Sequence, residues 1–275
     1  MSEHTNEQIN QQTEPQLEEL TRMVEPDAPK MGPVQRIINL FLAPGELMQN
    51  IKLYPVIAVP FVVALIIGLV SIPATSQMSE LMMQELSIIS IEMYGVDLSG
   101  WTQLQEQGLY GDDLTSAFNV FATVTMAISA AIMPFLYSAI AAVLFIILVK
   151  ILRGGARIGQ LFSMSMHLYI ISALGTAVVA ALMVSTGRLV DMTSLAAVIM
   201  PDGNISMLQF NLLSSISIFN IWSHVLVFIG IKVLNDFSVV KAGIITGVSL
   251  LATIAIHVGT YMSTFVMWDM IMRSM

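Results

Sequence analysis

The sequence contains no cysteine and very little charge. Charged side chains make up only 11% of its 275 residues, hydrophobic ones make up 56%, and the mean hydropathy is +0.79. Without cysteine there is no disulfide, no thiol nucleophile and no thiolate ligand for a metal. A soluble domain carries about 25% charged residues. The deficit therefore predicts an integral membrane protein whose surface faces the lipid bilayer.

The chain also lacks the motifs of catalysis and of nucleic-acid binding. Its net charge is −8 and no basic patch is interleaved with aromatic residues, so we expect no nucleic-acid partner. It has no HExxH, no GxSxG and no phosphate-binding loop, and the middles of its apolar runs hold no acidic residue. We therefore predict that the protein is not an enzyme and uses no cofactor and no catalytic metal.

Five runs are long and apolar enough to cross a bilayer, whose core needs about 20 residues of helix. Their approximate ranges are 55–75, 117–149, 159–185, 209–231 and 239–265. The predicted fold class is thus all-α, a polytopic membrane bundle of five transmembrane helices. We expect the second run to be one long helix kinked at Pro134, because its halves are too short to cross separately. Apolar residues at helical spacing over 78–93 predict an amphipathic extension of the first span.

The distribution of basic residues predicts the orientation. If the N-terminus is cytoplasmic, only Arg188 and Arg273 lie outside. The other nine of the eleven Lys and Arg residues then lie inside: Arg22, Lys30, Arg36, Lys52, Lys150, Arg153, Arg157, Lys232 and Lys241. This asymmetry is the positive-inside pattern, so we expect the N-terminus inside and the C-terminus outside.

The chain divides into three parts. Residues 1–30 are rich in Gln, Glu, Thr and Pro, and we expect a disordered acidic cytoplasmic tail because so few apolar residues cannot form a core. Residues 31–54 are expected to form an elbow of two short helices before the first span. Residues 55–275 are expected to form the five-span membrane domain.

The segment GPVQRIINLFLAPGE carries the evidence for this interfacial elbow. Apolar residues at i, i+3, i+4 and i+7, from Val34 to Phe41, give the first helix one apolar side that can lie in the cytoplasmic membrane surface. Pro44 ends that helix and is favoured as the first residue of the next one. Glu46 falls in the first turn, where its charge suits the helix dipole. Lys52 then anchors the segment at the lipid headgroups.

Three further stretches of the chain each carry a distinct motif. The first, in the elbow, is a phenylalanine followed by AP and then by an acidic residue, and a proline-flanked first span comes after it. The second is the basic, glycine-containing connection KILRGGARIGQLFSMSMHLY between spans two and three. The third is FNIWSHVLVFIGIKVLNDFSVVKAGIITG, an aromatic-led fourth span with a basic turn into the fifth. In this order they resemble the Yip family (Ypt/Rab-interacting-protein domain) in its prokaryotic form, over residues 32–265.

The resemblance implies a non-catalytic polytopic protein, and its prokaryotic form implies the bacterial cytoplasmic (inner) membrane. Eukaryotic members of the family act in vesicle trafficking through small GTPases. No residue of this chain matches a GTPase-contacting motif, so that role does not carry over.

Three histidines fall inside the predicted spans: His167, His224 and His257. Ionisable groups in a span are candidates for function. His167 and His224 are expected about 10–12 Å from the cytoplasmic side and His257 about 27 Å from it. Because three zinc ligands must each lie about 2.1 Å from one ion, we expect no three-histidine site. We expect hydrogen bonds to neighbouring helices, with a proton or ion path and a metal as alternatives.

Asn220 and His224 share one face of the fourth span because they are four residues apart. Together with nearby serines they make this the most polar span, and we expect it to face the bundle interior. Asn220, His224 and His167 are therefore the candidate polar intramembrane residues. Any transported species would meet Asn220 and His224.

Gly243 and Gly247 form a GxxxG motif at the start of the fifth span. Small residues at this spacing let two helices approach closely. We expect the pair to pack against another helix of the same chain, and a homo-oligomer contact is the alternative.

Two functional hypotheses remain at this point. In the first, the protein acts by binding and organises a membrane or protein partner, unidentified by the sequence, through its tail and elbow. In the second, it is a conduit or transporter for a small solute or ion, using the polar face of the fourth span. Transporters often contain internal repeats. We find none, which favours the first hypothesis.

Overall fold

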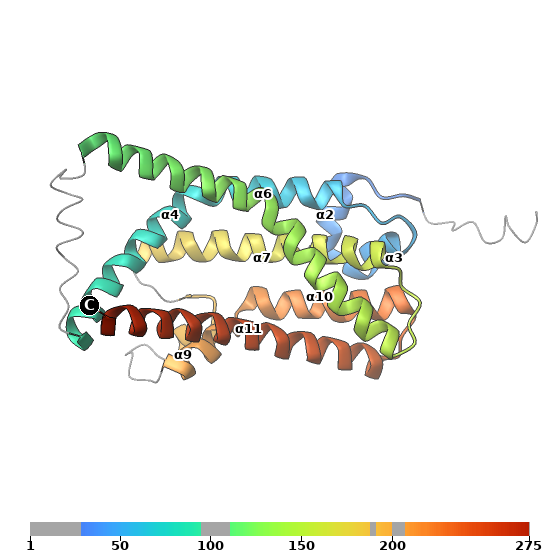
Figure 1. Ribbon diagram of the computed structural model, residues 1–275. Helices are drawn as coiled ribbons and strands as arrows, with labels where there is room; N and C mark the ends of the chain where they lie inside the picture. The colour runs from blue at the N-terminus through green and yellow to red at the C-terminus, as the bar shows by residue number, and fades with distance from the viewer. Residues whose placement is uncertain (1–28, 95–110, 188–190, 200–206, 275) are drawn as a thin grey trace, which may run out of the picture.

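The computed structural model describes residues 29–94, 111–187, 191–199 and 207–274. Over these residues the chain is helical apart from its connections and one isolated β-bridge between Ser194 and Ser217. Two short helices come first, and two more lie between the third and fourth long helices (Figure 1). In order, the helices are α2 (Pro33–Leu42), α3 (Pro44–Leu53), α4 (Ala58–Tyr94), α6 (Gly111–Ile151), α7 (Ile158–Thr186), α8 (Leu195–Ile199), α9 (Met207–Ser214), α10 (Ile218–Asn235) and α11 (Val239–Ser274).

Five of these helices are long and apolar enough to cross a membrane. The qualifying segments are Ala58–Ser79 of α4, Val120–Ile151 of α6, Ile158–Thr186 of α7, Ile218–Asn235 of α10 and Val239–Gly259 of α11. The all-α, five-span fold is thereby confirmed. The predicted tail lies outside the described residues except for its last two positions.

The first two spans belong to helices longer than a bilayer requires. α4 runs for 37 residues and includes the stretch 78–93 that its helical spacing singled out. α6 is one continuous helix of 41 residues with Pro134 inside it. Figure 1 shows α6 changing direction along its length, which is expected where a proline removes a hydrogen bond from the helix ladder.

The fourth span differs from its prediction. The apolar run predicted a helix from residue 209, but α9 ends at Ser214 and α10 begins only at Ile218. The Ser217 hydroxyl caps α10 by accepting a hydrogen bond from the Asn220 N–H at 3.3 Å. Serine side chains that bond to nearby backbone compete with a continuing helix, and a hydropathy average does not register that competition. The span therefore begins about nine residues later than expected.

The buried core is concentrated at one end of the bundle. We call this the elbow end; it contains α2, α3 and the connections 152–157 and 236–238, and the opposite end is the far end. The core cluster reaches only to Ala64 in α4, Ile171 in α7 and Ile245 in α11. Figure 1 shows α4 and α6 spreading apart toward the far end. Side-chain packing thus fixes the bundle mainly at the elbow end.

Two glycines bring α7 and α10 close together. A Cβ atom added at Gly230 would collide with the sulfur of Met164, and one added at Gly175 would lie 2.9 Å from Cγ of Phe219. Any residue larger than glycine would force a neighbour to move at either place. The two helices therefore approach each other closely at two separate positions along their length.

Candidate functional site

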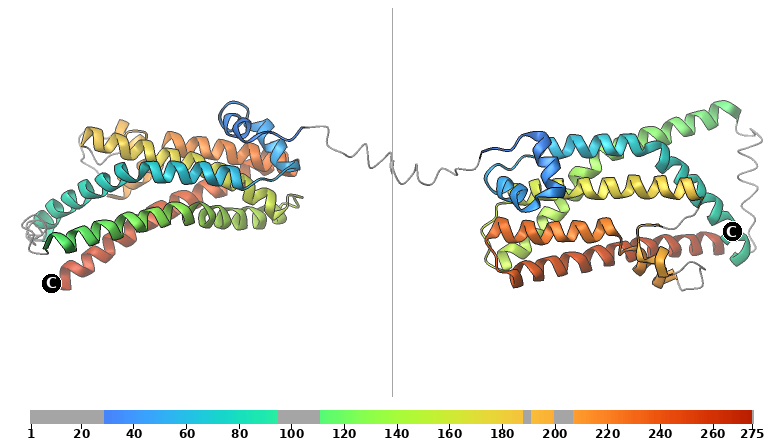
Figure 2. Two further views of the ribbon diagram at one scale, coloured as in Figure 1. Left: turned by 90° about the horizontal axis from the view of Figure 1, so that it is seen from above. Right: turned by 180° about the vertical axis from the view of Figure 1, so that it is seen from behind.

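Helix α2 buries its polar residues Arg36 and Asn39 together with Leu40, and it exposes several apolar side chains on its outer side. Arg36 and Asn39 are only 1% and 8% exposed, whereas Val34 and Leu42 are 71% and 79% exposed. Phe41, which belongs to the predicted apolar side, is 40% exposed. The right-hand view of Figure 2 shows α2 running across the direction of the long helices. An apolar helix side held across the end of a span bundle suits a membrane surface.

The Arg36 side chain joins the two elbow helices. Its Nη2 atom donates to Asn50 Oδ1 on α3 and to the Tyr54 carbonyl at 2.9 Å, and its Nε donates to the Met31 carbonyl at 3.4 Å. Asn50 Nδ2 in turn donates to the Pro29 carbonyl at 3.1 Å. Burial lowers the pKa of Arg36 from its ordinary value, but arginine stays protonated in proteins. Amide and carbonyl oxygens, rather than a carboxylate, therefore balance this buried charge.

Helix α3 fastens the elbow to the bundle by packing against α10 and α7. Pro44 is its first residue, and Glu46 lies in its first turn, where Oε2 accepts a hydrogen bond from Asn39 Nδ2 at 3.4 Å. Three of its side chains have no exposed surface: Leu47, Met48 and Ile51. Burial of three large apolar side chains stabilises the docked elbow, at about 1.5–3 kcal/mol each as an upper estimate.

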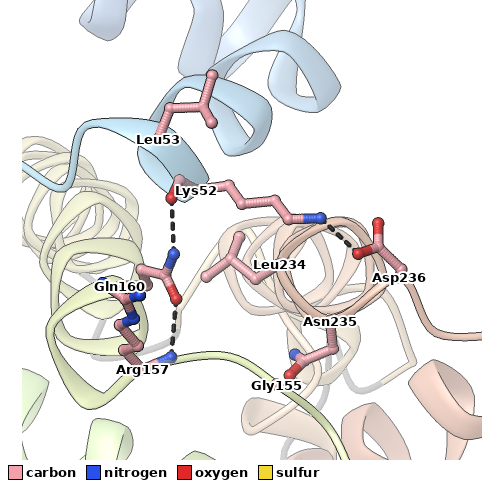
Figure 3. Close-up of a pocket in the computed structure, with 8 residues that line it drawn as sticks. All are labelled: Lys52, Leu53, Gly155, Arg157, Gln160, Leu234, Asn235 and Asp236. Atoms are coloured by element: carbon pink, nitrogen blue, oxygen red, sulfur yellow. Dashed lines mark hydrogen bonds and ion pairs between the residues drawn. The ribbon is translucent and has the colours of Figure 1, made fainter. Parts of the chain in front are cut away.

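A polar cavity of about 380 Å³ opens beside α3 at the elbow end (Figure 3). Lys52 Nζ lies 2.6 Å from Asp236 Oδ2, which links α3 to the end of α10. Gln160 Nε2 donates to the Lys52 carbonyl at 2.6 Å, and its Oε1 accepts from the Arg157 N–H at 2.7 Å. Asn235 Oδ1 accepts a hydrogen bond from the Ala156 N–H at 2.9 Å. These bonds tie α3, α7 and α10 together around the cavity.

The candidate polar intramembrane residues bond mainly to their own segments. His167 Nδ1 bonds to the Ser163 carbonyl at 2.7 Å, and His224 Nδ1 bonds to the Asn220 carbonyl at 2.8 Å. Because a carbonyl only accepts, Nδ1 carries the proton in both rings. Asn220 Nδ2 donates to the Ser215 carbonyl. Within the described residues, no three His, Asp or Glu side chains are grouped so as to hold a metal ion.

Backbone pairing closes the break that precedes α10. The Leu195 N–H donates to the Ile216 carbonyl at 3.0 Å, and the Ile218 N–H donates to the Thr193 carbonyl at 3.1 Å. Backbone N–H and C=O groups without hydrogen bonds are energetically unfavourable near hydrocarbon. These two bonds satisfy backbone groups at the break and so lower the free energy of a chain in which α10 begins late. Asn220 contributes to the same closure through Ser215.

Gly243 and Gly247 lie on an open face of α11. A Cβ atom added at either glycine would meet nothing within 4 Å. Among the described residues, no helix of the same chain packs closely on this motif, in contrast to the expected packing within the bundle. The homo-oligomer alternative stays a prediction.

Sequence reasoning missed most residues that join the elbow end. The pattern of α2 separates a polar side from an apolar side, but it does not say which side faces protein. A usable signal was present in three uncharged polar residues at the ends of helices: Asn50 in the last turn of α3, Gln160 in the first turn of α7 and Asn235 at the end of α10. Such side chains are usually hydrogen-bonded when buried.

A comparison with family models gives one match. The model described as the Yip1 domain matches residues 38–261, which includes α3, the cavity and the qualifying segments of all five spans. A search of the curated proteins gave no match, and neither did a search of the solved structures.

Proposed function

The chain belongs to the Yip1 domain family, and we propose that it is a non-catalytic membrane protein that organises protein or membrane partners at one face of the bilayer. The elbow and the tail that precedes it are the proposed organising elements. The polar residues of the five spans then serve the structure of the bundle rather than a reaction.

The charges of the elbow end support a cytoplasmic position for it. The bacterial inner membrane, as the membrane concerned, is proposed from the resemblance to prokaryotic members of the family. Among the described residues its carboxylates are Glu46 and Asp236. Its cations are Lys30, Arg36, Lys52, Lys150, Arg153, Arg157, Lys232 and Lys241. An excess of Lys and Arg close to span ends marks the cytoplasmic side.

The observation that carries the proposal is the orientation of α2, which points apolar side chains away from the rest of the protein. Its exposed apolar side chains are Val34, Ile38, Phe41 and Leu42, beside one exposed polar side chain, Gln35. Arg36 on the opposite side is buried. A contiguous exposed apolar surface of this kind marks a site that contacts a membrane or another protein. The boundary between headgroups and acyl chains supplies such a contact at the level where α2 lies across the bundle. A partner bound by the tail would then be held against the membrane surface.

A conduit through the fourth span is the second candidate. It is favoured by the break between α9 and α10, since transporters often bind substrates at interrupted helices. It is weakened by the bonds of Asn220 and His224, because both side chains bond to carbonyls of their own segment.

Labelling of introduced cysteines tests the position of α2. Because the chain has no cysteine, Leu42→Cys and Gln49→Cys each give one reactive thiol, and both parent residues are exposed. In sealed inverted membrane vesicles, a water-soluble maleimide is expected to react at least about tenfold more slowly at position 42, where lipid covers the thiol. In SDS, which removes the bilayer, the two rates are expected to be equal. Equal rates in the vesicles would remove the observation on which the proposal rests.

Crosslinking in the membrane followed by mass spectrometry tests the organising role. The full chain, a chain lacking residues 1–30 and the double variant Asn220→Leu, His224→Leu are compared. The expected result is a reproducible partner that is lost with the tail and kept by the double variant. No partner, only self-crosslinks along Gly243 and Gly247, or loss of a measured solute flux only in the double variant would favour the conduit.

A further inference from the structure

The cavity beside α3 carries positive charge that the fold leaves available. Within the described residues, no carboxylate lies at ion-pair distance from Arg157. Lys52 pairs with Asp236, but the Asp236 side chain is 78% exposed, and exposed pairs of this kind are weak. A second anion can therefore share Lys52 with Asp236 or replace it. The cavity thus holds two cations against one exposed carboxylate.

The backbone at the cavity also favours an anion. α7 begins at Ile158, and the first N–H groups of a helix carry partial positive charge. A Cβ atom added at Gly155, which lines the cavity, or at Gly159 would meet nothing within 4 Å, and neither glycine has a positive φ. Packing and backbone conformation therefore do not require glycine at either position. Their missing side chains leave the start of α7 open to a ligand.

The size and the lining of the cavity narrow the ligand class. A volume of about 380 Å³ accommodates a phosphate with a small substituent. None of its lining residues is aromatic, so it offers no surface on which a nucleotide base could stack. Leu53 and Ile158, at the cavity and next to it, are 37% and 49% exposed. Ile158 is the first residue of its span, and Leu53 lies five residues before Ala58, where the first span begins. Both positions are therefore near the level of the lipid headgroups.

We infer that the cavity binds the phosphate of an anionic phospholipid headgroup. Arg157, Lys52 and the first turn of α7 contact the phosphate oxygens, Gly155 leaves the space for the headgroup, and Leu53 and Ile158 contact the acyl chains. The inference rests on the placement of the five spans in a bilayer and does not require the partner-organising role.

Native mass spectrometry of the full chain in detergent micelles tests the site. Phosphatidylglycerol and phosphatidylcholine with identical acyl chains are added in turn, and the fraction of protein that retains lipid is measured. The variants are Gly155→Leu, which fills the cavity, and Arg157→Gln, which removes a cation. Arg153→Gln is the matched control, because Arg153 lies on the same connection but does not line the cavity. Glycerol phosphate and inorganic phosphate serve as soluble competitors.

The expected result is preferential retention of phosphatidylglycerol, weakened at least about fivefold by Arg157→Gln and by Gly155→Leu and changed less than about twofold by Arg153→Gln. Equal retention of phosphatidylcholine, or an equal loss with Arg153→Gln, would overturn the site. Inorganic phosphate that competes as well as glycerol phosphate and binds without lipid would overturn the lipid assignment in favour of a soluble anion. Circular dichroism checks each variant's helix content. If Gly155→Leu does not fold, Arg157→Gln and its control decide the outcome. Because this readout needs no protein partner, its failure is distinct from failure of the crosslinking experiment.

Discussion

The two ends of the bundle use their polar side chains differently. At the elbow end, polar side chains bond to other elements, as Arg36 does to Asn50 and as Gln160 does to the Lys52 carbonyl. Beyond the core, several hydroxyls bond back to the carbonyl four residues earlier in the same helix. These are Thr75 to Ser71, Thr125 to Phe121, Thr176 to Ser172 and Thr253 to Ser249. Such bonds satisfy a hydroxyl in an apolar setting but connect no two helices.

This difference indicates where the fold is specified. The elbow end combines the buried core with bonds between elements, so a change there is expected to affect the whole bundle. Toward the far end, single changes are expected to have local effects, because lipid replaces much of the protein contact. Four experiments test this contrast, taken from the largest expected effect to the smallest.

Asn50→Ala is expected to lower the free energy of unfolding by about 3 kcal/mol. It removes a hydrogen bond to the buried Arg36 guanidinium and leaves that charge with fewer oxygen partners. Denaturation by SDS in mixed micelles measures the change. Gln49→Ala, at an exposed position of the same helix, is the control and is expected to change stability by less than about 0.5 kcal/mol. Equal effects of the two would mean that the elbow network does not stabilise the bundle.

Gly230→Leu is expected to cost about 2 kcal/mol, because the new side chain would collide with Met164 in the core. The same substitution at Gly259, toward the far end, would meet nothing within 4 Å. There we expect no loss of stability and a small gain, because leucine is a better helix former than glycine. Thermal unfolding of both variants in one detergent gives the comparison. A loss at position 259 as large as that at position 230 would contradict the contrast between the ends.

Ser217→Ala is expected to cost about 1 kcal/mol through loss of the α10 cap. The effect should stay at the start of that helix. Hydrogen exchange is expected to speed up in the first turn of α10, from Ile218, and to remain unchanged around Leu226 in the core. Faster exchange in both regions would show that the break before α10 is coupled to the elbow end.

Lys52→Met is expected to change stability by about 0.5 kcal/mol or less, because its partner Asp236 is mostly exposed. Unfolding measured at about 0.01 M and about 1 M salt is the check. The difference from the parent chain should shrink at high salt, where exposed ion pairs are screened. A large effect that persists at high salt would show that the pair carries more of the elbow's attachment than its exposure indicates.

Hydropathy and helical spacing predicted the five spans and the continuity of α6 through Pro134 because both depend on averages over many residues. The start of the fourth span was predicted incorrectly because three residues, at 215–217, interrupt an otherwise apolar run. Glycine spacing likewise favoured Gly243 for helix packing, whereas α7 and α10 approach closely at Gly175 and Gly230. Which glycine meets a neighbour depends on how the helices are rotated in the bundle. That rotation is a property of the tertiary structure and leaves no periodic trace in one sequence.

The link between Lys52 and Asp236 also sets an order of events during synthesis. The two residues are 184 positions apart, so at about 5–20 residues per second the ribosome reaches the second one about 10–40 s after the first. Leu47, Met48 and Ile51 are made early, but α10, against which α3 packs, is the fourth of the five spans to appear. For that interval the elbow has no finished binding site on its own chain. The elbow can therefore dock completely only after the fourth span has been inserted. In a nascent chain halted before α10, these three side chains would have to be covered by chaperones or by the bilayer.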